Sequence, residues 1–209
     1  MWGVEPKRIA AAFAATAAAM ATMVARADDL PGTYGGHGVT FAYPTAWLHV
    51  PAQFDVQTGS ALWSEFFGPE PAPPTDPAQP TDPTQPAPPP PMQRDLVAVA
   101  AYKTNIAVTK KTLPRYKPMI SYFILRLATQ AGGTVLKGPQ RVTMGGLPGY
   151  RFQITANVDN GTIVESRVVL VFKGRTEFFL NCQHVQDGPL AAEIEGGCDQ
   201  LMKSFKLLK

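Results

Sequence analysis

The chain has 209 residues, of which 19 are Lys or Arg and 16 are Asp or Glu, so its formal net charge is only +3. Long-range attraction to nucleic acid or to an anionic membrane requires a large charge of one sign, which this composition lacks. No basic stripe interleaved with aromatic residues occurs either, and we expect no nucleic-acid partner. Without the leader described next, the chain of about 180 residues suits one domain with a full hydrophobic core.

Residues 1–27 have the pattern of a cleaved signal peptide. A short basic segment precedes an apolar or small run over residues 9–24. Ala25 and Ala27 then provide the small-x-small pattern that signal peptidase requires, with cleavage before Asp28. The alternative is a retained membrane anchor, although this run is short for a bilayer core that needs about 20 residues.

The leader also predicts the compartment and the charge of the exported chain. No Cys follows the apolar run, so we expect no attached lipid. We therefore expect a secreted or periplasmic protein that keeps no membrane span after cleavage. Cleavage would remove three basic side chains and one acidic side chain, which leaves 16 basic and 15 acidic side chains and a net charge of +1.

The beginning of the exported chain is predicted to lead into β-structure. Residues 28–38 are rich in Asp and Gly and are predicted to form a flexible leader. Alternation of side chains over residues 39–44, resumed over 47–50, predicts a hairpin or a bent strand pair with its turn at Pro44.

A third strand and a change of composition follow. Residues 60–67 alternate so that Trp63, Glu65 and Phe67 share one face of the predicted strand. Residues 69–91 then contain 12 prolines in 23 positions. Because Pro fixes φ and lacks an N–H donor, we predict a disordered, solvated insertion in a surface loop of one α+β domain. A ligand for a proline-recognition module is the alternative.

The remainder, to residue 208, is predicted to alternate helices with antiparallel strands. Apolar residues at steps of three and four predict a helix from near Arg115 to the pair Gly132-Gly133. A final helix is predicted after Pro189, weakened by the pair Gly196-Gly197. Turns are predicted at Asn160-Gly161 and at residues 173–175. The predicted strands are residues 96–102, 134–144, 150–158, 162–172 and 176–183.

Two cysteines, Cys182 and Cys198, predict one disulfide in an exported chain. We expect this bond to hold the final helix against the last long strand, and two buried free thiols are the alternative. No C-x-x-C redox motif occurs. His37, His49 and His184 share no spacing that is typical of metal ligands, so we expect no metal and no cofactor.

Four short motifs carry a resemblance to a known family. They are F-x-Y-P-x-x-W over residues 41–47, G-L-P-G-Y-R over 146–151, the turn at 160–161, and S-F-K-L over 204–207. Together they resemble the PsbP-like α/β/α sandwich superfamily, which includes an extrinsic photosystem II protein and many exported bacterial proteins of unknown role. The resemblance covers about residues 38–208 and implies an α+β fold, an antiparallel sheet flanked by helices. It carries no catalytic residues.

The sequence favours a non-catalytic function. No G-x-S-x-G, H-E-x-x-H, S-x-x-K or phosphate-binding glycine loop occurs. We therefore expect an exported binding domain of the cell envelope or extracellular space that acts on a protein partner. A small-molecule-binding protein or a hydrolytic enzyme with an unrecognised site is the alternative, and the sequence leaves the oligomeric state open.

Three aromatic residues are candidates for a binding surface. Trp63 and Phe67 lie on the strand before the Pro-rich insertion, and Trp47 lies at the opening turn. Packing in the core is the alternative for all three, because large aromatic side chains are usually well buried. The densest basic run, Lys110-Lys111 with Arg115 and Lys117, is interpreted as a solvated loop and helix start.

Overall fold

The computed structural model describes residues 32–51, 61–70, 94–158 and 161–208. The predicted signal peptide with its cleavage residues Ala25, Ala27 and Asp28 lies outside these ranges. Nearly all of the predicted Pro-rich insertion lies outside them as well. In the part of the chain that the structure describes, neither helix is long and apolar enough to cross a bilayer.

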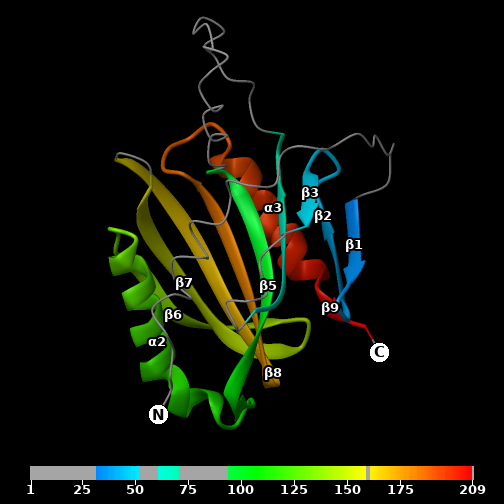
Figure 1. Ribbon diagram of the computed structural model, residues 1–209, viewed down its shortest axis with the longest axis vertical. Helices are drawn as coiled ribbons and strands as arrows, with labels where there is room; N and C mark the ends of the chain where they lie inside the picture. Colours follow the sequence, from blue (N-terminus) through cyan, green and yellow to red (C-terminus); the bar gives the residue numbers. More distant parts are fainter. Residues whose placement is uncertain (1–31, 52–60, 71–93, 159–160, 209) are drawn as a thin grey trace, which may run out of the picture.

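The strands form two antiparallel sheets (Figure 1). The small sheet has the order β1-β2-β9, and the large sheet has the order β3-β4-β5-β8-β7-β6. The strands of the small sheet are β1 (Gly32–Gly36), β2 (Val39–Tyr43) and β9 (Lys206–Leu207). The strands of the large sheet are β3 (Leu48–Pro51), β4 (Ala61–Gly68), β5 (Leu96–Val108), β6 (Val135–Met144), β7 (Leu147–Val158) and β8 (Thr162–Val185).

One helix covers each face of the large sheet (Figure 1). Helix α2 (Leu113–Gln130) packs on β6 and β7, and helix α3 (Ala191–Ser204) packs on β2, β5 and β8. Each helix buries an apolar stripe, which includes Ile120, Ile124 and Leu127 in α2. The predicted α+β architecture, an antiparallel sheet flanked by helices, is confirmed.

Strand β8 folds back on itself around Gly174. Gly174 has a φ of 60°, and the N–H of Gln186 donates to the carbonyl of Ile163 at 3.0 Å, so the two ends of β8 meet. The first arm of β8 pairs with β7 and the second arm pairs with β5. The turn predicted at residues 173–175 therefore lies where the sequence placed it, because only a residue that tolerates positive φ closes so tight a reversal.

Two predictions for the opening segment are wrong. Gly32–Gly36, inside the predicted flexible leader, form β1, which pairs along its whole length with β2. The predicted pairing of the next two strands also fails, because β2 lies in the small sheet and β3 lies in the large sheet. The N–H of Trp47 donates to the carbonyl of Pro44 at 3.0 Å, and this turn carries the chain from one sheet to the other.

A disulfide between Cys182 and Cys198 joins β8 to α3, as the sequence predicts. Their Cα atoms are 6.0 Å apart, and both side chains are fully buried. Arg167 of β8 also pairs with Glu195 and Asp199 of α3. A covalent bond and an ion-pair cluster therefore hold α3 on the sheet.

Candidate functional site

The candidate site is centred on the carboxylate of Glu65 in β4. The alternation predicted for this strand is confirmed: Trp63, Glu65 and Phe67 share the face toward the small sheet. Glu65 is only 6% exposed, although a buried carboxylate is costly unless it is paired and hydrogen-bonded. The side chains that bind this carboxylate therefore determine the chemistry of the site.

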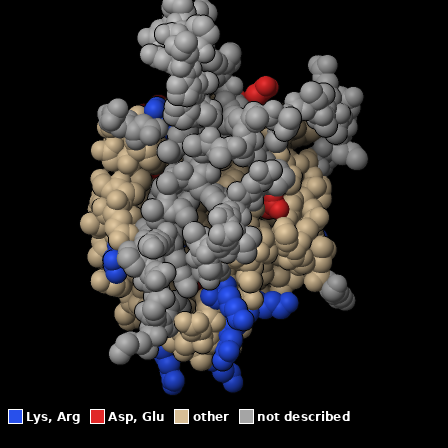
Figure 2. Space-filling model, viewed as in Figure 1, with Lys and Arg blue, Asp and Glu red and all other residues tan. Residues whose placement is uncertain are grey.

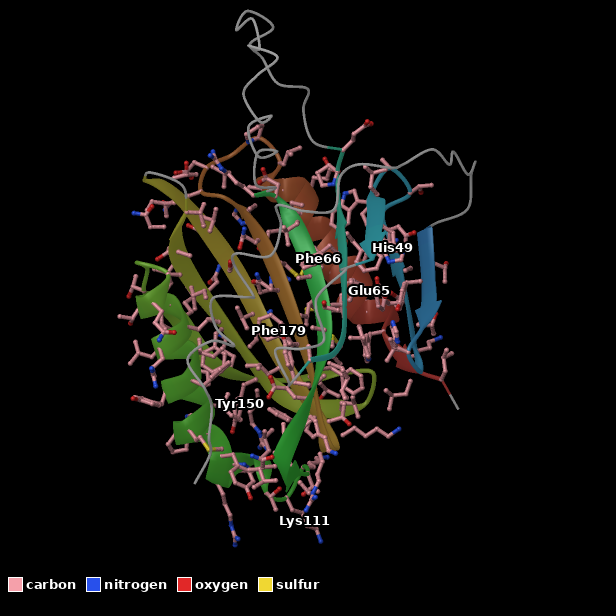
Figure 3. The ribbon with its side chains drawn as sticks, in the orientation of Figure 1. His49, Glu65, Phe66, Lys111, Tyr150 and Phe179 are labelled. Atoms are coloured by element: carbon pink, nitrogen blue, oxygen red, sulfur yellow. A yellow bond between two sulfur atoms is a disulfide. The ribbon has the colours of Figure 1, made fainter. Side chains whose placement is uncertain are left out.

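Three side chains from other elements bind this carboxylate. The hydroxyl of Tyr34 in β1 donates to Oε1 at 3.0 Å. Nε2 of His37, in the turn between β1 and β2, lies 3.2 Å from the same oxygen. Nε2 of His49 in β3 lies 2.8 Å from Oε2. Figure 3 shows His49 and Glu65 side by side between the two sheets.

The backbone of a tight turn places His37 at the site. His37 and Gly38 both have positive φ, 51° and 75°, as a two-residue type I′ hairpin requires. The imidazole of His37 stacks on the indole of Trp63, with 5.0 Å between ring centroids and 9° between planes. Glu65 holds one edge of His37, whose side chain remains 46% exposed. The pair of His37 and Trp63, called the His37–Trp63 surface below, is thus held in place and partly exposed to solvent.

Burial controls the electrostatics of Tyr34. Loss of solvent raises the pKa of the Tyr34 phenol well above its usual value of 10.0, and the adjacent Glu65 charge and the hydrogen bond to it raise this pKa further. Tyr34 therefore remains a hydrogen-bond donor throughout the physiological pH range. Aromatic contacts with Phe41 at 4.9 Å and Phe67 at 5.7 Å fix its ring.

The chemistry available to this cluster is proton exchange and hydrogen bonding. A carboxylate between two imidazoles can move a proton, and in many hydrolases such a base activates a Ser, Thr, Cys or Lys nucleophile. The bonds to Glu65 come from Tyr34, His37 and His49, and none of these is such a nucleophile. Both cysteines are in the disulfide. Among the described residues, no group of three or more His, Cys, Asp and Glu side chains could hold a metal ion.

The three aromatic residues predicted as a binding surface have different environments. Trp47 and Phe67 are buried, at 4% and 1% exposure, so the prediction of an exposed surface is wrong for these two. Trp47 packs against Gly197 of α3 and its Nε1 donates to Glu193 at 2.8 Å. Phe67 is packed among the aromatic rings of Tyr34, Phe41, Tyr43 and His49. Trp63 alone is partly exposed, beside His37.

Sequence reasoning missed the cluster around Glu65. The available signal was Glu65 itself, a carboxylate between Trp63 and Phe67 on the apolar face of a strand. Such a position demands buried partners. His37 and His49 were the right residue types, but their spacing in sequence does not show that a shared carboxylate brings them together.

The fold is known, although the sequence has no close match. No family model matches this chain, and no curated protein matches it. Cyanobacterial PsbP from Synechocystis sp. PCC 6803 has a similar structure with a TM-score of 0.56 and 10% sequence identity. The match covers 90% of this chain and 98% of that protein. The chain therefore has a PsbP-like fold, which confirms the resemblance at the level of fold.

Two further structures are more distant. LpqN, involved in cell envelope biogenesis of Mycobacterium tuberculosis, matches with a TM-score of 0.48 and 12% identity, over 86% of this chain and 90% of that protein. A protein from Bacteroides thetaiotaomicron VPI-5482 matches with a TM-score of 0.45 and 13% identity. That match covers 82% of this chain but only 46% of the Bacteroides protein, so the chain spans under half of its length. The fold assignment rests on the cyanobacterial protein alone.

Proposed function

We propose that this protein is an exported, non-catalytic binding domain of the cell envelope or extracellular space, which docks a protein partner on the His37–Trp63 surface. The observation that carries this proposal is the stacked pair itself. His37 is exposed and Trp63 is partly exposed, and the buried Glu65 bonds His37 at 3.2 Å, which keeps its ring stacked on the indole. Rigid, partly exposed aromatic side chains are typical anchors of protein interfaces, because little conformational entropy is lost when they are covered.

Export is supported by the signal-peptide pattern and by the disulfide, since disulfides persist in oxidising compartments outside the cytoplasm. We expect material recovered from the periplasm or medium to begin at Asp28. Intact-mass measurement of the exported protein tests this. A mass that includes Met1 would show that the leader is retained.

A matched pair of variants on one strand tests the docking surface. Trp63→Ala removes the anchor, whereas Leu62→Ala removes an exposed side chain, 51% accessible, at the adjacent position of β4. Wild type and both variants are immobilised and exposed to envelope and secreted proteins of the host, and bound proteins are quantified by mass spectrometry. We expect a partner retained by wild type and Leu62→Ala and lost by Trp63→Ala. Equal retention by all three proteins would refute docking at this surface.

A second candidate function, small-molecule binding, is favoured by one observation. Ser166 Oγ and Asn181 Oδ1 are buried and have no hydrogen-bond partner within the described ranges. Both belong to β8, where each lies two residues from an apolar residue that packs toward α2, Val168 or Phe179, and therefore shares its face of the sheet. Unsatisfied buried polar atoms are rare, and a ligand is one way to satisfy them. A thermal-shift screen against small polar compounds, with Asn181→Leu as the control, tests this candidate.

A further inference from the structure

The small net charge of the chain conceals an uneven distribution. From residue 96 to residue 158 the sequence contains nine Lys and Arg residues and no Asp or Glu. This segment forms β5, α2, β6 and β7. The acidic residues Glu193, Glu195 and Asp199 lie instead on α3, on the other face of the large sheet. Opposite charges are thus concentrated on different parts of the molecule.

The tertiary structure adds basic residues from β8 to this segment. Val108, the last residue of β5, pairs with Gly174, so Lys173 and Arg175 lie beside the start of the connection to α2. That connection carries Lys110 and Lys111. We define the basic end as seven side chains, all exposed: Lys103, Lys110, Lys111, Arg115, Lys117, Lys173 and Arg175. Figure 2 shows Lys and Arg gathered at the lower end of the molecule, and Figure 3 places Lys111 there.

Within the described ranges, these charges have no ion-pair partner. None of the seven side chains forms an ion pair with a described residue; the ion pairs of the described part involve His37, His49, Arg167 and His184. Glu177, which pairs with Tyr102 across β5 and β8, is the acidic residue in this stretch of β8. The first turn of α2 contains no acidic residue, so Arg115 and Lys117 lie at the positive end of the helix dipole, where cations are unfavourable. An external anion would relieve this repulsion.

The outer face of α2 continues the basic end with apolar side chains. Tyr122 is 61% exposed and Leu125 is 49% exposed, although both are large and apolar or aromatic. They share one side of the helix with Arg115 and Arg126, because Tyr122 lies seven residues after Arg115, three before Leu125 and four before Arg126. Tyr residues flanked by Lys and Arg are typical of the boundary between lipid headgroups and hydrocarbon.

We propose that the basic end and the outer face of α2 bind the surface of a bilayer that contains anionic phospholipids. The Lys and Arg side chains contact headgroup phosphates, and Tyr122 and Leu125 enter the headgroup layer. This peripheral contact is separate from the His37–Trp63 surface and goes beyond the proposed function. A lipid surface fits better than nucleic acid, because the aliphatic Leu125 is exposed beside the charges and, among the described residues, Tyr122 is the one exposed aromatic side chain there on which a base could stack.

The test is co-sedimentation of the full chain with vesicles of phosphatidylcholine alone or mixed with phosphatidylglycerol. The basic-end variant is Lys110→Glu with Lys111→Glu, and the matched control is Lys203→Glu with Lys206→Glu, exposed residues of α3 and β9 with the same change in net charge. We expect binding that requires phosphatidylglycerol and weakens with added salt, and a loss of about tenfold or more in the basic-end variant. The control should retain binding close to wild type.

Every chain in this comparison carries the same leader, so insertion of the leader does not create a difference between the variants. The proposal would be overturned by equal binding to both kinds of vesicle, or by an equal loss in the two variants. It would also be overturned if the protein bound an acidic polypeptide or single-stranded DNA in a manner that depends on Lys110 and Lys111, while binding no anionic vesicles. Tyr122→Ala should weaken vesicle binding without changing the melting temperature.

Discussion

At the scale of single residues, Glu65 is a buried carboxylate held by side chains from three other parts of the fold. Its carboxylate accepts bonds from Tyr34 and from one or both imidazoles, at 2.8 to 3.2 Å, and links β4 to β1, to the turn after β1 and to β3. Removing one partner of a buried hydrogen-bonded group leaves the others without compensation, and this costs more than the bond contributes on average.

Replacement of this carboxylate should therefore destabilise the domain. We expect Glu65→Ala to lower the free energy of unfolding by about 2–3 kcal/mol, because the buried Tyr34 hydroxyl loses its acceptor. Glu70→Ala, at an exposed position two residues after the end of β4, should change it by less than about 0.5 kcal/mol. Urea denaturation of the two variants and wild type measures both values, and equal stability of the two variants would contradict the structural role.

Tyr34 should make stability depend on alkaline pH. Its pKa is raised in the folded protein, so the folded state keeps the phenol proton when the unfolded chain, with a pKa near 10.0, releases it. The contribution of Tyr34 is therefore fully present below pH 10 and is lost as pH rises above that value. Comparing the unfolding free energy of wild type and Tyr34→Phe between pH 8 and about 11 should show a shallower decline in the variant. Parallel curves would contradict this assignment.

At the scale of elements, α3 is held on the sheet more by close contacts than by its own helix propensity. Gly196 and Gly197 both lie inside the helix, where Gly is less favourable than Ala by up to about 1 kcal/mol. Their surroundings differ. Gly196 has open space around it, whereas a Cβ at Gly197 would collide with the ring of Trp47. Close packing against Trp47 therefore explains the glycine at position 197, but packing does not explain the glycine at position 196.

This difference predicts opposite effects of the same substitution. Gly196→Ala should raise the free energy of unfolding by up to about 1 kcal/mol, through helix propensity alone. Gly197→Ala should lower it by about 1–3 kcal/mol, because Trp47 is buried and cannot move away without disturbing its bond to Glu193. Thermal unfolding of the two variants provides the comparison. Two changes of the same sign would show that Trp47 does not fix the approach of α3.

The disulfide should contribute at the same scale. Cys182 and Cys198 are 16 residues apart, and closing a loop of this size stabilises the folded state by about 3 kcal/mol in the chain-entropy account. For a domain of this size we expect the double variant Cys182→Ala and Cys198→Ala to melt about 6–12 °C below wild type. Reduced wild type should approach the variant. If neither the double variant nor reduction lowers the melting temperature, the disulfide does not stabilise the domain.

At the scale of the whole molecule, charge is segregated although its sum is small. The basic end collects cations from β5, α2 and the turn of β8, while α3 carries Glu193, Glu195 and Asp199. An external charged surface orients a protein whose charges are segregated. Adsorption therefore depends on where a charge lies on the protein as well as on the net charge.

Ion-exchange chromatography measures this asymmetry directly. On a cation exchanger near neutral pH, we expect Lys110→Glu with Lys111→Glu to elute at lower salt than Lys203→Glu with Lys206→Glu, because the two variants have equal net charge but only the first changes the basic end. Elution of both variants at the same salt concentration would indicate that net charge alone governs adsorption.

The sequence by itself determined the features that depend on near neighbours in the chain. Steps of three and four residues predicted α2 and α3, and alternation predicted most strands of the large sheet. Gly161 and Gly174 marked reversals where positive φ is needed, whereas Asn160 lies outside the described residues. The cysteine pair predicted its own bond, since two cysteines permit a single intramolecular pairing.

Only the tertiary structure decided the features that join distant segments. The partners of Glu65 lie 16 to 31 residues away in sequence, and the residues that pack Trp47 against α3 are about 150 residues away. Strand β1 has five residues, three of them Gly, and is ordered by pairing with β2 rather than by its own propensity. The basic end likewise requires β5 and β8 to pair. Local patterns encode backbone conformation and the buried face of an element, whereas which elements meet depends on the packing of the whole core.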